Sequence, residues 1–196
     1  MPSAVEKIQR CHLSQWQICN LNPSTGRKTE LLVKQSLERS LIGQGLIGTV
    51  HLNDSTEKRT KPDIYLNTCG RSLSLDCRHW TGTKSRRGKV YPTRELYGYA
   101  RGEPSLVTYL QDTRRFLFMA WELTIVDTAT GHKERRLFCV PGLWLQDQFN
   151  HLTGMPIEDI ASAAWPGFSK GSDLLYDIDI LGLIDTADNY QGVRRS

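Results

Sequence analysis

Two short runs of alternating apolar and polar residues, joined by Cys69 and Gly70, constrain the fold more than any other part of the sequence. Alternation with a period of two predicts β-strands that bury one face. A glycine supplies the positive φ that a two-residue hairpin turn needs. With this turn, Asp63 and Asp76 fall at directly opposite positions, with their Cβ atoms about 5 Å apart. The sequence therefore predicts an antiparallel hairpin on which two carboxylates meet.

The two faces of this hairpin differ in chemistry. The apolar face carries Ile64, Leu66, Leu73, Leu75 and Cys77, and the polar face carries Asp63, Tyr65, Asn67, Ser72, Ser74, Asp76 and Arg78. Like charges directly opposite each other destabilise a hairpin unless something compensates them. Mg²⁺ would compensate, because it binds a few carboxylate oxygens together with water and phosphate, and Arg78 is an alternative partner. An ordinary hairpin whose polar face meets water is the competing interpretation.

The remaining elements are of mixed type. Apolar residues at helical spacing predict a helix over 29–43, capped by Thr29 and ended by Gly43. Strands are predicted over 15–21, 46–52, 115–126, 135–140 and 174–184, and short helices over 143–154 and 156–165. This order predicts an α/β fold of the mixed α+β kind, with a central mixed or antiparallel sheet flanked by helices. A length of 196 residues suits a single domain over 1–196.

Positive charge is concentrated in one segment, although the net charge is only +4. Between residues 84 and 101 a single acid accompanies six basic residues, which are Lys84, Arg86, Arg87, Lys89, Arg94 and Arg101. Lysine and arginine attract phosphates in a salt-dependent way, and the interleaved tyrosines can stack on bases or simply pack. The segment indicates contact with a nucleic-acid backbone, with a solvated loop as the alternative.

The cysteines and the hydropathy pattern bear on the compartment. Five scattered cysteines do not form the even, regularly spaced set of a disulfide framework. No apolar run approaches the length that crosses a bilayer, and the N-terminal residues lack a secretory signal. We therefore expect a cytoplasmic protein with reduced thiols and no membrane contact.

The stretches PDIYL (62–66) and LSLDCR (73–78) resemble the PD-(D/E)xK signature of the restriction-endonuclease-like nucleases. In that family a helix precedes a sheet of hairpin strands, an aspartate opens the second strand, and an acid and a lysine two positions apart lie on the third. The resemblance spans about residues 29–140. It implies Asp63 and Asp76 as metal ligands and Arg78 in the place of the lysine. It also implies a further acid from the helix, Glu38 or Glu30.

The activity implied by this resemblance is Mg²⁺-dependent hydrolysis of DNA phosphodiester bonds, as in a type II restriction endonuclease. The substrate would be double-stranded DNA, and a protein that cuts a palindrome would be a homodimer. Arginine cannot act as a base, because it stays protonated, but it can stabilise developing negative charge. Catalysis also requires that the two acids lie under an open, positively charged groove.

Two alternatives from other functional classes remain. One is a non-catalytic nucleic-acid-binding protein, or a defence- or virus-related accessory protein, on the same fold. The other is a protein-interaction domain whose hairpin face is merely polar.

Overall fold

The computed structural model describes residues 25–53, 62–84, 88–91, 116–148, 155–160, 165–168 and 175–193. Its centre is a six-stranded sheet with the strand order β1-β2-β3-β4-β5-β6. The strands are β1 (Gly48–Leu52), β2 (Ile64–Thr68), β3 (Arg71–Thr83), β4 (Phe116–Val126), β5 (Lys133–Pro141) and β6 (Trp165–Phe168). Neighbouring strands are antiparallel except β3 and β4, which run parallel. The predicted α+β class with a mixed central sheet is confirmed.

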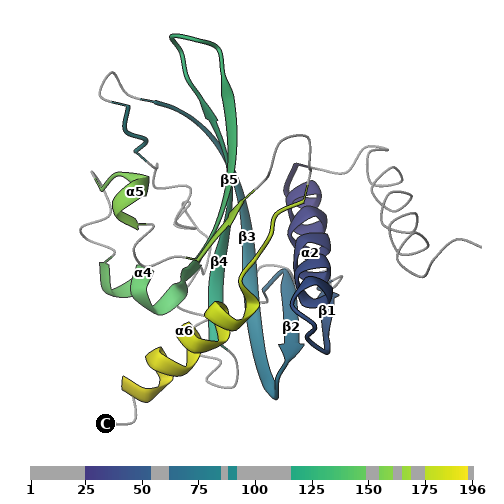
Figure 1. Cartoon of the computed structure of the whole chain (residues 1–196). Helices are drawn as coiled ribbons and strands as arrows, with labels where there is room; N and C mark the ends of the chain where they lie inside the picture. Colours follow the sequence, from purple (N-terminus) through teal and green to yellow (C-terminus); the bar gives the residue numbers. More distant parts are fainter. Residues whose placement is uncertain are drawn as a thin grey trace, which may run out of the picture.

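Helices cover both faces of this sheet (Figure 1). The helices are α2 (Thr25–Gly43), α4 (Gly142–Gln148), α5 (Ile157–Ile160) and α6 (Ile180–Val193). One apolar core lies between the sheet and α2 with α6, and a second lies between the sheet and α4 with α5. Strand β4 therefore buries both of its faces, with Phe118 and Ala120 in the first core and Met119 and Trp121 in the second.

Helix α2 packs through the apolar stripe that its sequence predicts. Val33, Leu37 and Leu41 are buried against the hairpin strands, and Gly43 ends the helix as expected. The helix begins at Thr25, so the prediction that Thr29 caps it is wrong. Thr29 lies inside the helix because the helix begins one turn before the apolar stripe. Its side chain is buried.

The hairpin between β2 and β3 has the predicted register. Its Cα pairs run from Thr68 opposite Arg71 to Ile64 opposite Leu75, and the apolar face is buried in the first core. Cys69 and Gly70 both have positive φ, 51° and 70°. Positive φ at both central residues is characteristic of a type I′ turn, whose twist matches that of the flanking strands.

The C-terminal segment differs from its prediction, because the sequence predicts a strand over 174–184 and this is wrong. Tyr176 and Ile178 are extended and buried, but a helix begins at Ile180. The Asp179 carboxylate accepts a hydrogen bond from the backbone N–H of Gly182 (3.0 Å), which is the arrangement of an N-cap. From there the buried positions follow helical spacing. The alternating run DIDI (177–180) therefore leads into a capped helix and does not form a long strand.

The other elements agree with the sequence in type and differ in length. Strands β1, β4 and β5 lie where strands are expected, α4 begins one residue before the first predicted short helix, and α5 lies within the second. Strand β6 begins at Trp165, the last residue of the second predicted helix. The predicted strand over 15–21 lies outside the described residues.

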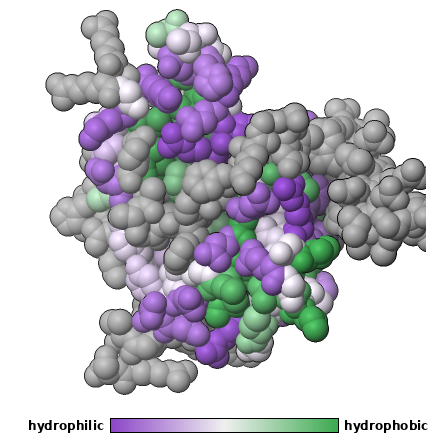
Figure 2. All heavy atoms as spheres, viewed as in Figure 1, coloured by the Kyte–Doolittle hydropathy of each residue, from purple (hydrophilic) through white to green (hydrophobic). Residues whose placement is uncertain are grey.

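Part of the surface is apolar. In Figure 2 the apolar atoms visible on this face lie mainly in the lower central and right part of the view. The large exposed apolar side chains among the described residues include Ile42, Ile47 and Leu181. In the described part of the chain, no helix is long and apolar enough to cross a membrane.

The type I′ turn allows a direct test of the hairpin register. Replacing Cys69 by Asn should raise the free energy of unfolding by about 1 kcal/mol, because asparagine tolerates positive φ better than most side chains. Cys69→Val should lower it, since a β-branched residue is strained there. Urea unfolding followed by circular dichroism measures both. Equal stability of the two variants would contradict the assigned turn.

Candidate functional site

Asp63 and Asp76 lie side by side where β2 begins. Asp63 directly precedes Ile64, and its Oδ2 accepts a hydrogen bond from the backbone N–H of Cys77 (2.8 Å). The carboxyl groups of Asp63 and Asp76 lie close enough together that each influences the pKa of the other. The structure therefore brings together the two side chains that the hairpin register places opposite each other.

The polar face around this pair is more enclosed than the sequence predicts. Asp76 is only 4% exposed and Ser74 only 2%. The expectation of an open groove above both acids is therefore wrong for Asp76. Asp63 is half-buried, and 29% of the Arg78 side chain is exposed. Solvent reaches the cluster at Asp63 and Arg78.

The electrostatics of the pair follow from this burial. Burial raises the pKa of Asp76 to about 7, and the charge of Asp63 acts in the same direction. The Arg78 guanidinium opposes the rise through a hydrogen bond from its Nε to Asp76 Oδ2 (3.0 Å). Burial also raises the pKa of Asp63, although the hydrogen bond from the N–H of Cys77 acts to lower it. Near neutral pH the two carboxyl groups therefore share a proton, as expected for like charges in contact.

Of the two acids proposed from the helix, Glu30 is the one near this pair. Its charge raises the pKa of both Asp63 and Cys77, and Arg27 donates a hydrogen bond to its carboxylate (2.8 Å). Glu38 lies about 12 Å further along the helix axis and forms an ion pair with Lys34. The structure therefore does not bring Glu38 to the pair.

A signal in the sequence separates these two acids. At about 100° per residue, Glu30 falls about 20° from the middle of the stripe formed by Val33, Leu37 and Leu41, whereas Glu38 falls about 100° from it. Side chains three and four apart on a helix share a face, and this face is the one that packs on the hairpin. Glu38 lies outside that stripe.

The possible metal ligands are few. Among the described residues, no group of three or more His, Cys, Asp or Glu side chains is placed to hold a metal ion. Any ion at this position would therefore be held by Asp63 and Asp76, with water and substrate oxygens completing its coordination. Mg²⁺ is commonly bound in this way, through one or two carboxylates.

The predicted basic segment is described only in part. Lys84 Nζ lies 3.8 Å from a carboxylate oxygen of Glu134, and Lys89 is exposed. Val90 is buried, and its carbonyl accepts a hydrogen bond from the N–H of Ile157 (2.8 Å), which attaches this stretch to α5. The other four residues assigned to nucleic-acid contact, Arg86, Arg87, Arg94 and Arg101, lie outside the described residues.

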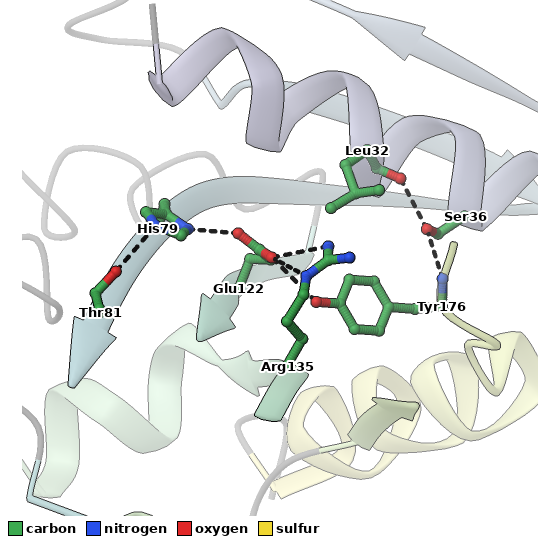
Figure 3. A network of polar contacts seen from close by, with 7 residues as sticks. All are labelled: Leu32, Ser36, His79, Thr81, Glu122, Arg135 and Tyr176. Carbon is green, nitrogen blue, oxygen red and sulfur yellow. Dashed lines mark hydrogen bonds and ion pairs between the residues drawn. The ribbon is translucent and has the colours of Figure 1, made fainter. Parts of the chain in front are cut away.

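A second polar cluster, which the sequence analysis missed, lies on the opposite face of β3 (Figure 3). His79, Arg135 and Tyr176 all point toward the carboxylate of Glu122 on β4. Glu122 Oε1 accepts hydrogen bonds from Nε (3.2 Å) and Nη2 (3.0 Å) of Arg135 and from the Tyr176 hydroxyl (3.1 Å). The Nδ1 atom of His79 contacts Oε2, and Thr81 Oγ1 lies 3.4 Å from Nε2 of that ring.

This second cluster is electrostatically balanced. Burial disfavours the charge of Glu122, but the hydrogen bonds from His79 and Arg135 outweigh it and lower the pKa of that carboxyl group. The hydrogen bond to Glu122 in turn raises the pKa of His79. The one sequence signal is an acid inside the apolar run FLFMAWELTIV, since a buried charge needs partners.

Comparison with known proteins does not assign the chain to a family. No protein-family model matches the chain, and a search of curated proteins finds no match. Function is therefore inferred from the geometry of the two clusters.

The shared proton predicts a pH dependence that Asp76→Asn should remove. In the unfolded chain Asp76 loses its proton near its ordinary pKa of 3.8, whereas the folded protein keeps it up to about 7. The folded state then binds more protons between these values. Stability that is present below pH 4 is therefore lost as the pH rises toward 7.

Urea unfolding in EDTA, repeated from pH 4.5 to 8, measures this loss in the wild type and in Asp76→Asn. The raised pKa of His79 acts in the same direction in both proteins, so the difference between them reports the titration of the pair that Asp76 forms with Asp63. Identical pH profiles would contradict the assignment of the proton to Asp76.

Glu122 should contribute more to stability than an exposed glutamate with a similar arginine partner. Glu122→Ala should cost about 3–5 kcal/mol, because it leaves Arg135 without its buried partner. Glu134 is the matched control, since its carboxylate accepts two hydrogen bonds from Arg136 but is 35% exposed. Glu134→Ala should cost at most about 1 kcal/mol. Equal losses in urea unfolding would contradict a central role of Glu122.

Proposed function

We propose that the protein is a Mg²⁺-dependent nuclease of the restriction-endonuclease-like class, which hydrolyses phosphodiester bonds of double-stranded DNA. The observation that carries the proposal is that the hairpin places the Asp63 and Asp76 carboxylates next to each other, with Arg78 at the next position on the same face of β3. The order of the elements supports it, because α2 precedes the hairpin, Asp63 opens β2, and Asp76 and Arg78 lie on β3. This order is the one that the sequence resemblance implies.

The donor set suits a hard divalent cation. Two carboxyl groups that share a proton can exchange it for a cation, which supplies the compensating charge instead. On the same face, Ser74 Oγ is buried and has no hydrogen-bond partner within the described chain. Asp63 and Asp76 would hold the ion, and Mg²⁺ bound there would lower the pKa of a water ligand and polarise a phosphate.

The remaining side chains have positioning and electrostatic roles in this proposal. The N–H of Cys77 orients the Asp63 carboxylate, and Arg78 orients that of Asp76. The partly exposed Arg78 guanidinium can stabilise negative charge that develops on the substrate phosphate. Because it stays protonated, Arg78 cannot accept the proton of the attacking water. Arg78 would therefore take over the electrostatic role of the family's lysine but could not act as a base.

The compartment and the assembly are part of the same proposal. Cys69, Cys77 and Cys139 are free thiols, which fits the reducing environment of the cytoplasm. A homodimer would suit a palindromic DNA site.

The alternative is a non-catalytic nucleic-acid-binding protein, or a defence- or virus-related accessory protein with the same fold. Two observations favour it, namely the burial of Asp76 and the presence of arginine where the family has lysine. It differs from the nuclease in one measurable respect, since it would bind DNA without cleaving it.

The decisive measurement is cleavage of supercoiled plasmid DNA in Mg²⁺, compared with the same reaction in EDTA. The wild type should cut only with the metal, and Asp76→Ala should cut at least ~10²-fold more slowly, because a group that binds the metal and the transition state is lost. Asp185→Ala is the matched control, since Asp185 is an exposed aspartate on α6. Salt-dependent DNA binding without cleavage in every variant would instead support the alternative.

A further inference from the structure

Ser74 is a buried polar residue of the candidate site whose hydroxyl has no partner among the described residues. A buried hydroxyl that makes no hydrogen bond costs roughly 1–3 kcal/mol. Folded proteins rarely retain this cost without a bound water or ion at the position. Its place in the sheet indicates which species that is.

The neighbours of Ser74 come from three strands. Tyr65 of β2 lies opposite it, and Leu117 of β4 lies beside it and is buried. Along β3, the next side chain on the same face is Asp76, about 7 Å away. This spacing is too long for a direct hydrogen bond between the two side chains. A bridging species between Ser74 and the carboxyl pair would satisfy both.

We propose that Ser74 is a positioning residue of the metal centre, and that its Oγ hydrogen-bonds a water ligand of the divalent cation held by Asp63 and Asp76. This inference rests on the proposed function. Mg²⁺ keeps several of its waters when only one or two carboxylates bind it. Those waters need hydrogen-bond partners in the protein, and such partners outside the coordination shell commonly change metal affinity 10–100-fold.

Ser72 provides a matched control on the same strand. It lies on the same face as Ser74, two residues further along β3 from Asp76. It is exposed, and its Oγ already donates a hydrogen bond to Asn67 Oδ1 (2.7 Å). Removing this hydroxyl should leave the metal centre unchanged, although the chemical change is identical.

The test is Mn²⁺ binding by isothermal titration calorimetry to the full chain of the wild type, Ser74→Ala and Ser72→Ala. Mn²⁺ is chosen because it binds oxygen ligands of the same kind as Mg²⁺. Ser74→Ala should bind Mn²⁺ 10–100-fold more weakly, and Ser72→Ala should bind it like the wild type. In EDTA, Ser74→Ala should melt at the same temperature or higher, because alanine removes a buried hydroxyl without a partner.

Each result separates this inference from the proposed function. Equal Mn²⁺ affinity in Ser74→Ala and the wild type overturns the role of Ser74, while plasmid cleavage by the wild type would still support the nuclease. Weaker Mn²⁺ binding in Ser74→Ala, without cleavage by any variant, supports the metal centre and overturns the nuclease. A wild type that binds no Mn²⁺ overturns both.

Discussion

Strand β3 pairs with an antiparallel strand on one side and with a parallel strand on the other, and these two pairings determine where the polar groups of this protein meet. Strand β2 is joined to β3 by a two-residue turn and is antiparallel to it, which sets Asp63 against Asp76. Strand β4 is parallel to β3, which sets His79 beside Glu122. Because successive side chains of a strand point to opposite faces, β3 supplies an acid pair to one face and a histidine to the other. A shift of one residue in either pairing would disperse the cluster that this pairing brings together.

The two clusters differ in how their charge is compensated. Glu122 receives hydrogen bonds from Arg135, Tyr176 and His79, so its charge is stabilised despite burial. The acid pair places two carboxyl groups against one close guanidinium, and burial raises the pKa of both acids. Buried groups with such perturbed pKa values are concentrated at functional sites, although structural ion pairs perturb them as well. The acid pair, whose charge is only partly compensated, is therefore the better candidate for chemistry, and the balanced cluster is the better candidate for stability.

The parts of this arrangement that the sequence predicts are those with local causes. The hairpin register follows from alternation and one glycine, and it places Asp63 and Asp76 correctly. Strand β4 follows from its apolar and aromatic composition. The burial of Asp76 could not be predicted, because it depends on what covers the sheet. The Glu122 cluster joins residues separated by 13 to 54 positions, and nothing in their local sequence reports that approach. The prediction of a C-terminal strand is wrong because Asp179 caps a helix at that point, although apolar and polar residues continue to alternate up to it.

Helix α2 connects the two clusters to the rest of the fold. Ser36 and Ser40 of α2, and Gln44 just after its end, lie four residues apart and accept hydrogen bonds from the backbone N–H groups of every second residue over 176–180. Four residues of helix rise about 6 Å and two residues of extended chain about 6.6 Å, so a helix stripe can match an extended segment over this length. This match holds Tyr176 in the position from which its hydroxyl reaches Glu122. The same helix carries Glu30 toward Asp63. The contacts of α2 therefore stabilise the balanced face of β3, and that stability can support the cost of a buried, partly protonated acid pair on the other face.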